Sequence, residues 1–213
     1  MCWNAEVSLN TFMFSSFVLL LIIYNNTYTK YKIKEFNLYR YIFFMSVILM
    51  QLVEYFIWRN INNPFYNYVF SLCTVVLLTF QPLASLMLLQ NAKIKQVLIM
   101  IYLLFAVPYL LFTVLWVNVY SAISPTGHLQ WYFTNGKYYE YIGIWLFYLF
   151  FLLFAFFYNG YTHEYIMGIV FLMLAIYNYY KDNSVGSMWC WIVNSVMIYY
   201  AVYLLIYLPY ILK

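Results

Sequence analysis

The stretch LYRYIFFMSVILMQLVEYFIW, Leu38–Trp58, indicates the class of fold that this chain adopts. Its apolar residues follow one another continuously instead of alternating with polar ones, and it has the length of about 20 residues that a membrane-crossing helix needs. Only Arg40, near its start, and Glu54, well inside it, carry a charge. The stretch therefore predicts a transmembrane helix that holds one buried carboxylate.

The whole chain has the composition of this stretch. Of its 213 residues, 67% are hydrophobic and 8% are charged, whereas a soluble domain carries roughly 25% charged residues. So few charged residues exclude a water-soluble globular protein. We therefore expect an integral, multi-pass membrane protein whose main partner is the lipid bilayer.

Seven apolar runs give an all-α polytopic fold, which we expect to form a single domain over residues 1–213. The sixth run is short, and six spans would follow if it did not cross. The runs are Val7–Tyr24, Leu38–Trp58, Phe65–Gln90, Gln96–Val117, Tyr141–Tyr158, Tyr165–Tyr180 and Met188–Leu212.

The basic residues give the expected orientation. With seven spans, one side of the membrane holds Lys30, Lys32, Lys34, Arg40, Lys93, Lys95 and Lys213, and the other holds only Arg59, Lys137 and Lys181. Because cytoplasmic loops are enriched in Lys and Arg, the N-terminus is predicted outside and the C-terminus inside. These residues are interpreted as topology and headgroup anchors and not as a nucleic-acid surface. His163 and Glu164 are interpreted as a solvated loop pair on the inner side.

The loop Asn118–Glu140 is longer than the others and contains Pro125, Gly127 and His128. The remaining loops are short, so consecutive helices should be antiparallel neighbours. We expect the long loop to form an outer cap or an interfacial segment.

Polar residues recur at helical spacing inside the spans. Gln51, Glu54 and Trp58 share one face of the second span, and Glu6 lies on a polar face of the first. Gln81, next to Pro82, and Asn194 lie in the third and seventh spans. Together they predict an outward-facing polar pocket around Glu54, with Glu54, Gln51, Gln81, Asn194, Glu6 and Trp58 as ligand-binding residues. The alternative is that Gln81 and Asn194 only hydrogen-bond neighbouring helices.

Cys2 and Cys190 are both expected near the outer surface, where they could form a disulfide or remain separate thiols. No spacing demands a metal site, and His128 and His163 fall on opposite sides of the membrane. No retinal cofactor is expected, because Met188–Leu212 contains no lysine for a Schiff base.

Several motifs along the chain resemble those of a poorly characterised family of small multi-pass membrane proteins of large DNA viruses and some microbes. The motifs are Met1-Cys2-Trp3 with Ser8, Gln51-x-x-Glu54-x-x-x-Trp58, Gln81-Pro82, and Gly186-Ser187-Met188-Trp189-Cys190-Trp191 with Asn194. The many Phe, Tyr, Ile and Asn residues, which have A/T-rich codons, and the few Ala and Gly residues agree with an AT-rich viral genome. The resemblance implies a membrane protein and no settled activity.

Three functions remain open. The first is a channel or transporter for a proton, another ion or a small polar solute, with Glu54 as the charged ligand. The second is a non-enzymatic structural protein of a virion or organelle membrane, alone or as a homo-oligomer. The third is a membrane enzyme or sensor for a lipid-like ligand, for which we find no catalytic motif. The converging polar residues favour the first.

Overall fold

A computed structural model describes residues 4–133 and 142–211. Four helices begin the chain: α1 (Ala5–Tyr28), α2 (Leu38–Arg59), α3 (Pro64–Leu86) and α4 (Ala92–Trp116). A hairpin of β1 (Tyr120–Ile123) and β2 (Leu129–Tyr132) follows, and then α5 (Ile142–Tyr158) and α6 (Thr162–Tyr179). The last long segment consists of α7 (Val185–Val193), α8 (Val196–Val202), the π-helical turn η2 (Tyr203–Tyr207) and α9 (Leu208–Ile211).

Asparagines set the starts of the first four helices. The side-chain oxygens of Asn4, Asn37, Asn63 and Asn91 each accept a hydrogen bond from a backbone N–H in the first turn that follows. This N-cap satisfies a donor that the helix itself leaves unpaired.

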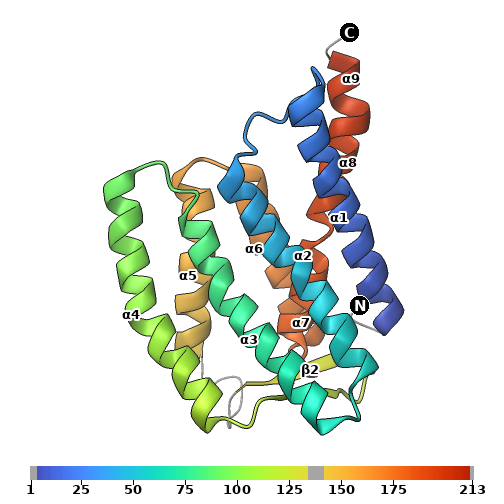
Figure 1. Cartoon of the computed structure of the whole chain (residues 1–213), viewed down its shortest axis with the longest axis vertical. Helices are drawn as coiled ribbons and strands as arrows, with labels where there is room; N and C mark the ends of the chain where they lie inside the picture. The colour runs from blue at the N-terminus through green and yellow to red at the C-terminus, as the bar shows by residue number, and fades with distance from the viewer. Residues whose placement is uncertain (1–3, 134–141, 212–213) are drawn as a thin grey trace.

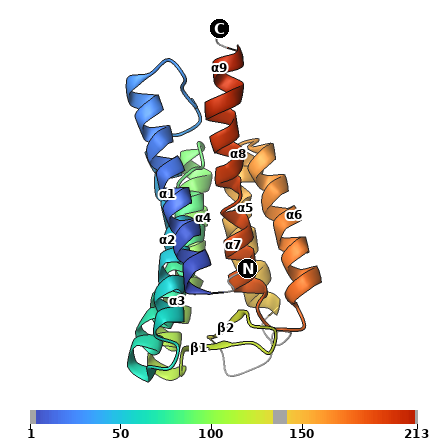
Figure 2. The same cartoon turned by 90° about the vertical axis from the view of Figure 1, so that its right-hand side faces the viewer.

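The helices run up and down as a bundle (Figures 1 and 2). In it, α2 packs between α1 and α3, α3 also packs on α5, and α6 packs on α7. The hairpin lies across one end of the bundle, and the C-terminus lies at the opposite end (Figure 2). We call these the hairpin end and the C-terminal end.

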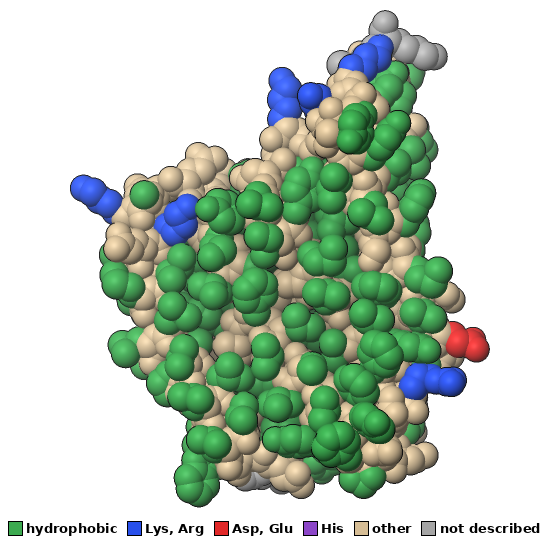
Figure 3. Space-filling model, in the orientation of Figure 1, with side chains coloured by type: hydrophobic (Ala, Val, Ile, Leu, Met, Phe, Trp, Pro, Cys, Tyr) green, Lys and Arg blue, Asp and Glu red, His purple; other side chains and the backbone are tan. Residues whose placement is uncertain are grey.

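Apolar side chains cover the outside of the bundle. On α4, Leu104 and Leu115 are each 69% exposed, and on α6 Tyr177 is 87% exposed. Figure 3 shows hydrophobic side chains over most of one face, with most of the basic side chains seen there near its upper end. Such a surface suits acyl chains and not water.

Five helical segments within the described residues are long and apolar enough to cross a membrane: α1, α2, α3, α4 and the continuous stretch Val185–Ile211. The apolar helix α5 is shorter, at 17 residues, and α6 is not among the five. A helical, multi-pass membrane protein is thus confirmed. Seven spans and the sidedness of the termini stay predictions.

The hairpin is the difference from the expected all-α fold. The expected cap Asn118–Glu140 pairs Tyr120 with Tyr132 and Ile123 with Leu129; residues 134–140 lie outside the described part. Gly127 closes the turn at a φ of 84°, a conformation that costs glycine little. The two strands are too short for an alternating sequence pattern to reveal them.

Candidate functional site

Glu54 lies on the buried face of α2 and is 0% exposed. The Nε2 atom of Gln51, one turn earlier and also fully buried, donates a 2.8 Å hydrogen bond to its Oε2 atom. Glu54 precedes the end of α2 by five residues, or about 8 Å of helix. The predicted pair of polar residues in the second span is therefore brought together inside the protein.

An apolar cluster surrounds the Glu54 face of α2. Met50 and Ile57 of α2 pack with Met188 and Cys190 of α7 and with two residues of β2, Leu129 and Trp131. Cys190 also lies within electrostatic range of the Glu54 carboxylate. The carboxylate is thus enclosed between α2, α7 and the hairpin, and it does not line an outward-open pocket in this conformation.

Polar contacts fix the hairpin over this region. Ser187 of α7 donates a 2.6 Å hydrogen bond to the carbonyl of Leu129. The Nε2 atom of Gln130 donates to the carbonyl of Asp182, whose Oδ2 atom accepts a 2.7 Å bond from Thr126. The hairpin is therefore attached to the loop between α6 and α7.

Asn194 lies at a break in the last membrane segment. The N–H groups of Asn194 and Ser195 donate to the carbonyls three residues earlier, as do those of Met197 and Ile198, which is the tighter pattern of a 3₁₀ turn. Asn194 is 4% exposed and donates 2.9 Å to the carbonyl of Cys190. Its Oδ1 atom is buried and has no hydrogen-bond partner within residues 4–133 and 142–211.

Gln81 is 3% exposed and joins two other helices. Its Oε1 atom accepts a 2.8 Å hydrogen bond from the hydroxyl of Tyr148 on α5, and its Nε2 atom donates 3.4 Å to the carbonyl of Ser46 on α2. These contacts fit the alternative interpretation, helix packing, although Gln81 also borders the cavity described below.

The other two predicted site residues, Glu6 and Trp58, differ in their surroundings. Glu6 is exposed in the first turn of α1, so it does not share the enclosed site of Glu54. Trp58 is half-buried and packs on the apolar cluster around Glu54; its indole N–H has no hydrogen-bond partner among the described residues.

Cys190 is a buried free thiol. The structure therefore does not show the disulfide considered for it with Cys2, and Cys2 itself lies outside the described residues. In the described part of the chain, no group of three or more His, Cys, Asp or Glu residues is placed to hold a metal ion.

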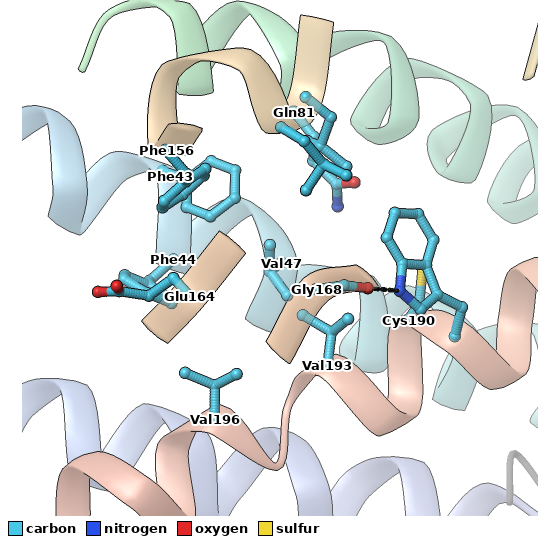
Figure 4. A pocket seen from close by; sticks show the side chains of 13 residues that line it. Phe43, Phe44, Val47, Gln81, Phe156, Glu164, Gly168, Cys190, Val193 and Val196 are labelled. Atoms are coloured by element: carbon cyan, nitrogen blue, oxygen red, sulfur yellow. Dashed lines mark hydrogen bonds between the residues drawn. The ribbon is translucent and has the colours of Figure 1, made fainter. Parts of the chain in front are cut away.

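A cavity of about 60 Å³ lies between α2, α3, α5, α6, α7 and α8 (Figure 4). Its wall is almost wholly apolar; Gln81, Glu164 and Cys190 are the exceptions. The lining residues are Phe43, Phe44, Val47, Gln81, Leu152, Leu153, Phe156, Glu164, Gly168, Trp189, Cys190, Val193 and Val196. Glu54, Gln51 and Asn194 do not border it.

The structure contains a buried ion pair that the sequence did not suggest. Arg40 of α2, interpreted above as a surface anchor, is 2% exposed and paired with Glu164 of α6. The interpretation of His163 and Glu164 as a solvated pair is thus wrong for Glu164, while His163 is exposed. The partners lie 124 residues apart, so no local spacing could have revealed them.

Comparisons of the chain with protein families, with curated proteins and with solved structures give no match. The function is therefore inferred from the geometry alone.

Proposed function

We propose that this protein is a transporter or channel for a proton, another ion or a small polar solute, and that its charged ligand is Glu54. The observation that carries the proposal is the complete burial of Glu54 beside Gln51 in a membrane-crossing helix. A carboxylate at such a place is costly, and in membrane proteins this cost is characteristic of ion pathways and proton relays.

The broken last segment supports transport over simple packing. Asn194 and Ser195 interrupt it about one turn beyond Cys190, a residue of α7 that lies within electrostatic range of the Glu54 carboxylate. Interrupted membrane helices supply backbone and side-chain ligands at the binding sites of many transporters. The Oδ1 atom of Asn194, which has no hydrogen-bond partner in the part of the chain that the structure describes, is one such group.

The enclosure of Glu54 favours a transporter whose site is closed in this conformation. The hairpin and α7 cover the carboxylate at the hairpin end. We further propose that seven helices cross the membrane with the hairpin end outside, as the basic residues predict, and that the chain belongs to the viral and microbial family whose motifs it resembles.

The experiment compares two carboxylates in purified protein reconstituted into liposomes. Influx of protons and of sodium or potassium is followed with entrapped dyes for wild type, Glu54→Gln and Glu6→Gln. We expect flux through wild type and Glu6→Gln and loss of flux in Glu54→Gln, with unchanged thermal unfolding. Equal flux in Glu54→Gln and wild type would refute the role of Glu54.

A structural membrane protein is the second candidate, because Gln81 and Ser85 are hydrogen-bonded to neighbouring helices. Ser85 donates 2.6 Å to the carbonyl of Leu152 on α5. Folded wild-type protein that carries neither protons nor sodium nor potassium in the liposome assay would favour this structural role.

A further inference from the structure

A second charged cluster lies at the C-terminal end of the bundle, far from Glu54. Arg40 and Glu164 stand in the first turns of α2 and α6. The hydroxyl of Tyr200 in α8 donates 2.6 Å to the same Oε1 atom of Glu164 that Arg40 binds. One carboxylate oxygen thus ties three helices together.

The surroundings of Arg40 remove its guanidinium group from water. Its guanidinium carbon lies 4.3 Å from the ring centroid of Tyr161 and 5.2 Å from that of Phe36. Its Nη1 atom also donates to the carbonyl of Glu35 at 3.3 Å. A guanidinium packed between aromatic rings retains a strong attraction for its carboxylate partner because little water competes.

The cavity lies between this cluster and the region of Glu54. Figure 4 shows Glu164 and Cys190 on opposite sides of the cavity, with Val47, Gly168 and Val193 between them. Cys190 belongs to the apolar cluster that encloses Glu54. Arg40 and Glu54 are separated by fourteen residues of α2, or about 21 Å of helix, and the cavity borders α2 between them, from Phe43 to Val47.

We infer that the cavity is the inner section of the transport pathway and that the Arg40–Glu164–Tyr200 cluster is the gate that closes it toward the C-terminal end. The inference rests on the proposed function. In the closed state α6 is held to α2 and α8 through Glu164. Opening separates Glu164 from Arg40 and Tyr200 and admits water to the cavity.

The chemistry of the pathway narrows the substrate to a proton or a small cation. Each end carries a carboxylate, Glu54 and Glu164, and the cavity walls between them are apolar. A space of about 60 Å³ has room for a few water molecules, since each needs about 10–15 Å³ of space measured in this way. In this closed conformation the space is too small for a sugar or an amino acid.

Cys190 is a natural reporter of the gate, because its buried thiol borders the cavity. In a Cys2→Ser/Cys73→Ser background it is the single cysteine of the chain. A membrane-impermeant cationic methanethiosulfonate reagent is added to oriented vesicles on one side or the other, and the rate of modification of Cys190 is measured by mass spectrometry.

We expect slow modification in the background protein and a rate increase of about ten-fold or more in Glu164→Gln, from the C-terminal side only, since a closed two-state gate leaves an open population of about 1%. Lys93→Gln, which removes an exposed cation at the same end, should leave the rate unchanged. The charge swap Arg40→Glu/Glu164→Arg should restore slow modification and guards against a simple folding defect.

Unchanged modification in Glu164→Gln, or an equal rise from both sides, overturns the gate. A folded swap variant that is modified as fast as Glu164→Gln also overturns it. Because the readout is thiol reactivity, it is independent of ion flux. A protein that is modified as expected but carries no ion would retain the gated cavity and refute the transport proposal.

Discussion

Asn67 of α3 and Ser121 of β1 exchange two hydrogen bonds, although 54 residues separate them. The Nδ2 atom of Asn67 donates 2.9 Å to the carbonyl of Ser121, and the Ser121 N–H donates 2.8 Å to Oδ1 of Asn67. The hydroxyls of Ser71 and Ser121 are also hydrogen-bonded to each other, at 2.7 Å. The side-chain amide of Asn67 thus pairs with the backbone of β1 as a neighbouring strand would, and it fixes the hairpin to the bundle.

Replacing this amide should loosen the hairpin. Asn67→Ala leaves a buried N–H and a buried carbonyl of Ser121 without these bonds, and we expect a loss of about 2 kcal/mol in the free energy of unfolding. Thermal unfolding in detergent and amide hydrogen exchange over residues 120–132 measure the effect. Asn178→Ala is the control, since Asn178 is exposed and its side chain donates to the carbonyl of Leu174 within α6; equal destabilisation of both variants would contradict the prediction.

Gly186 is required by the close approach of Trp131. A Cβ atom at Gly186 would lie 3.0 and 3.1 Å from two ring atoms of Trp131 and 3.4 Å from Trp145. Gly186→Ala should therefore cost about 1–3 kcal/mol as an overpacked core does, visible as a lower unfolding temperature. Gly143→Ala in α5 meets nothing within 4 Å and should be neutral or slightly stabilising. A Gly186→Ala protein as stable as wild type would show that Trp131 is free to shift.

The hairpin should also be sensitive to acid. Burial lowers the pKa of His128 below its ordinary value of 6.5, and the carboxylate of Asp182 opposes this effect. The unfolded chain therefore binds a proton more readily than the folded one, and stability falls as the pH drops through and below 6.5. We expect the unfolding temperature to decrease from about pH 8 to pH 5, and His128→Gln to reduce this dependence. An identical pH profile for His128→Gln would assign the loss to other groups.

The Arg40–Glu164 pair should behave as a buried ion pair in a double-mutant cycle. Either single change, Arg40→Met or Glu164→Met, leaves a charge without its partner and should cost about 3–5 kcal/mol. Arg40→Met/Glu164→Met should recover most of that loss, because both desolvated charges are gone. Thermal unfolding of the four proteins gives the coupling energy, and additive losses would mean that the two side chains act independently.

The sequence predicts the helices well because their signals are local. The second apolar run is Leu38–Trp58, and α2 runs from Leu38 to Arg59. Glu54 was expected inside the protein for a reason that composition alone supplies, the cost of a charge in hydrocarbon, and it is fully buried. The length of the apolar run is sufficient to predict α2, and the charge of Glu54 is sufficient to predict its burial.

The remaining features depend on contacts between distant parts of the chain. The pairing of Arg40 with Glu164 and the attachment of Ser121 to Asn67 join elements far apart in sequence. The break at Asn194 and Ser195 contains neither proline nor glycine, so no residue type marks it. Glu6 has the same charge as Glu54 but is exposed, because only packing decides which face of α1 turns inward.

The last membrane segment is overwound in one place and underwound in another. The turn at Asn194 and Ser195 follows the tighter 3₁₀ pattern, with three residues per turn instead of 3.6, and Tyr203–Tyr207 forms a wider π turn. The piece between these two turns, Val196–Val202, is therefore turned about the segment axis relative to its place in an uninterrupted α-helix. Tyr200 lies on that piece, so the two irregular turns set the direction in which its hydroxyl reaches Glu164.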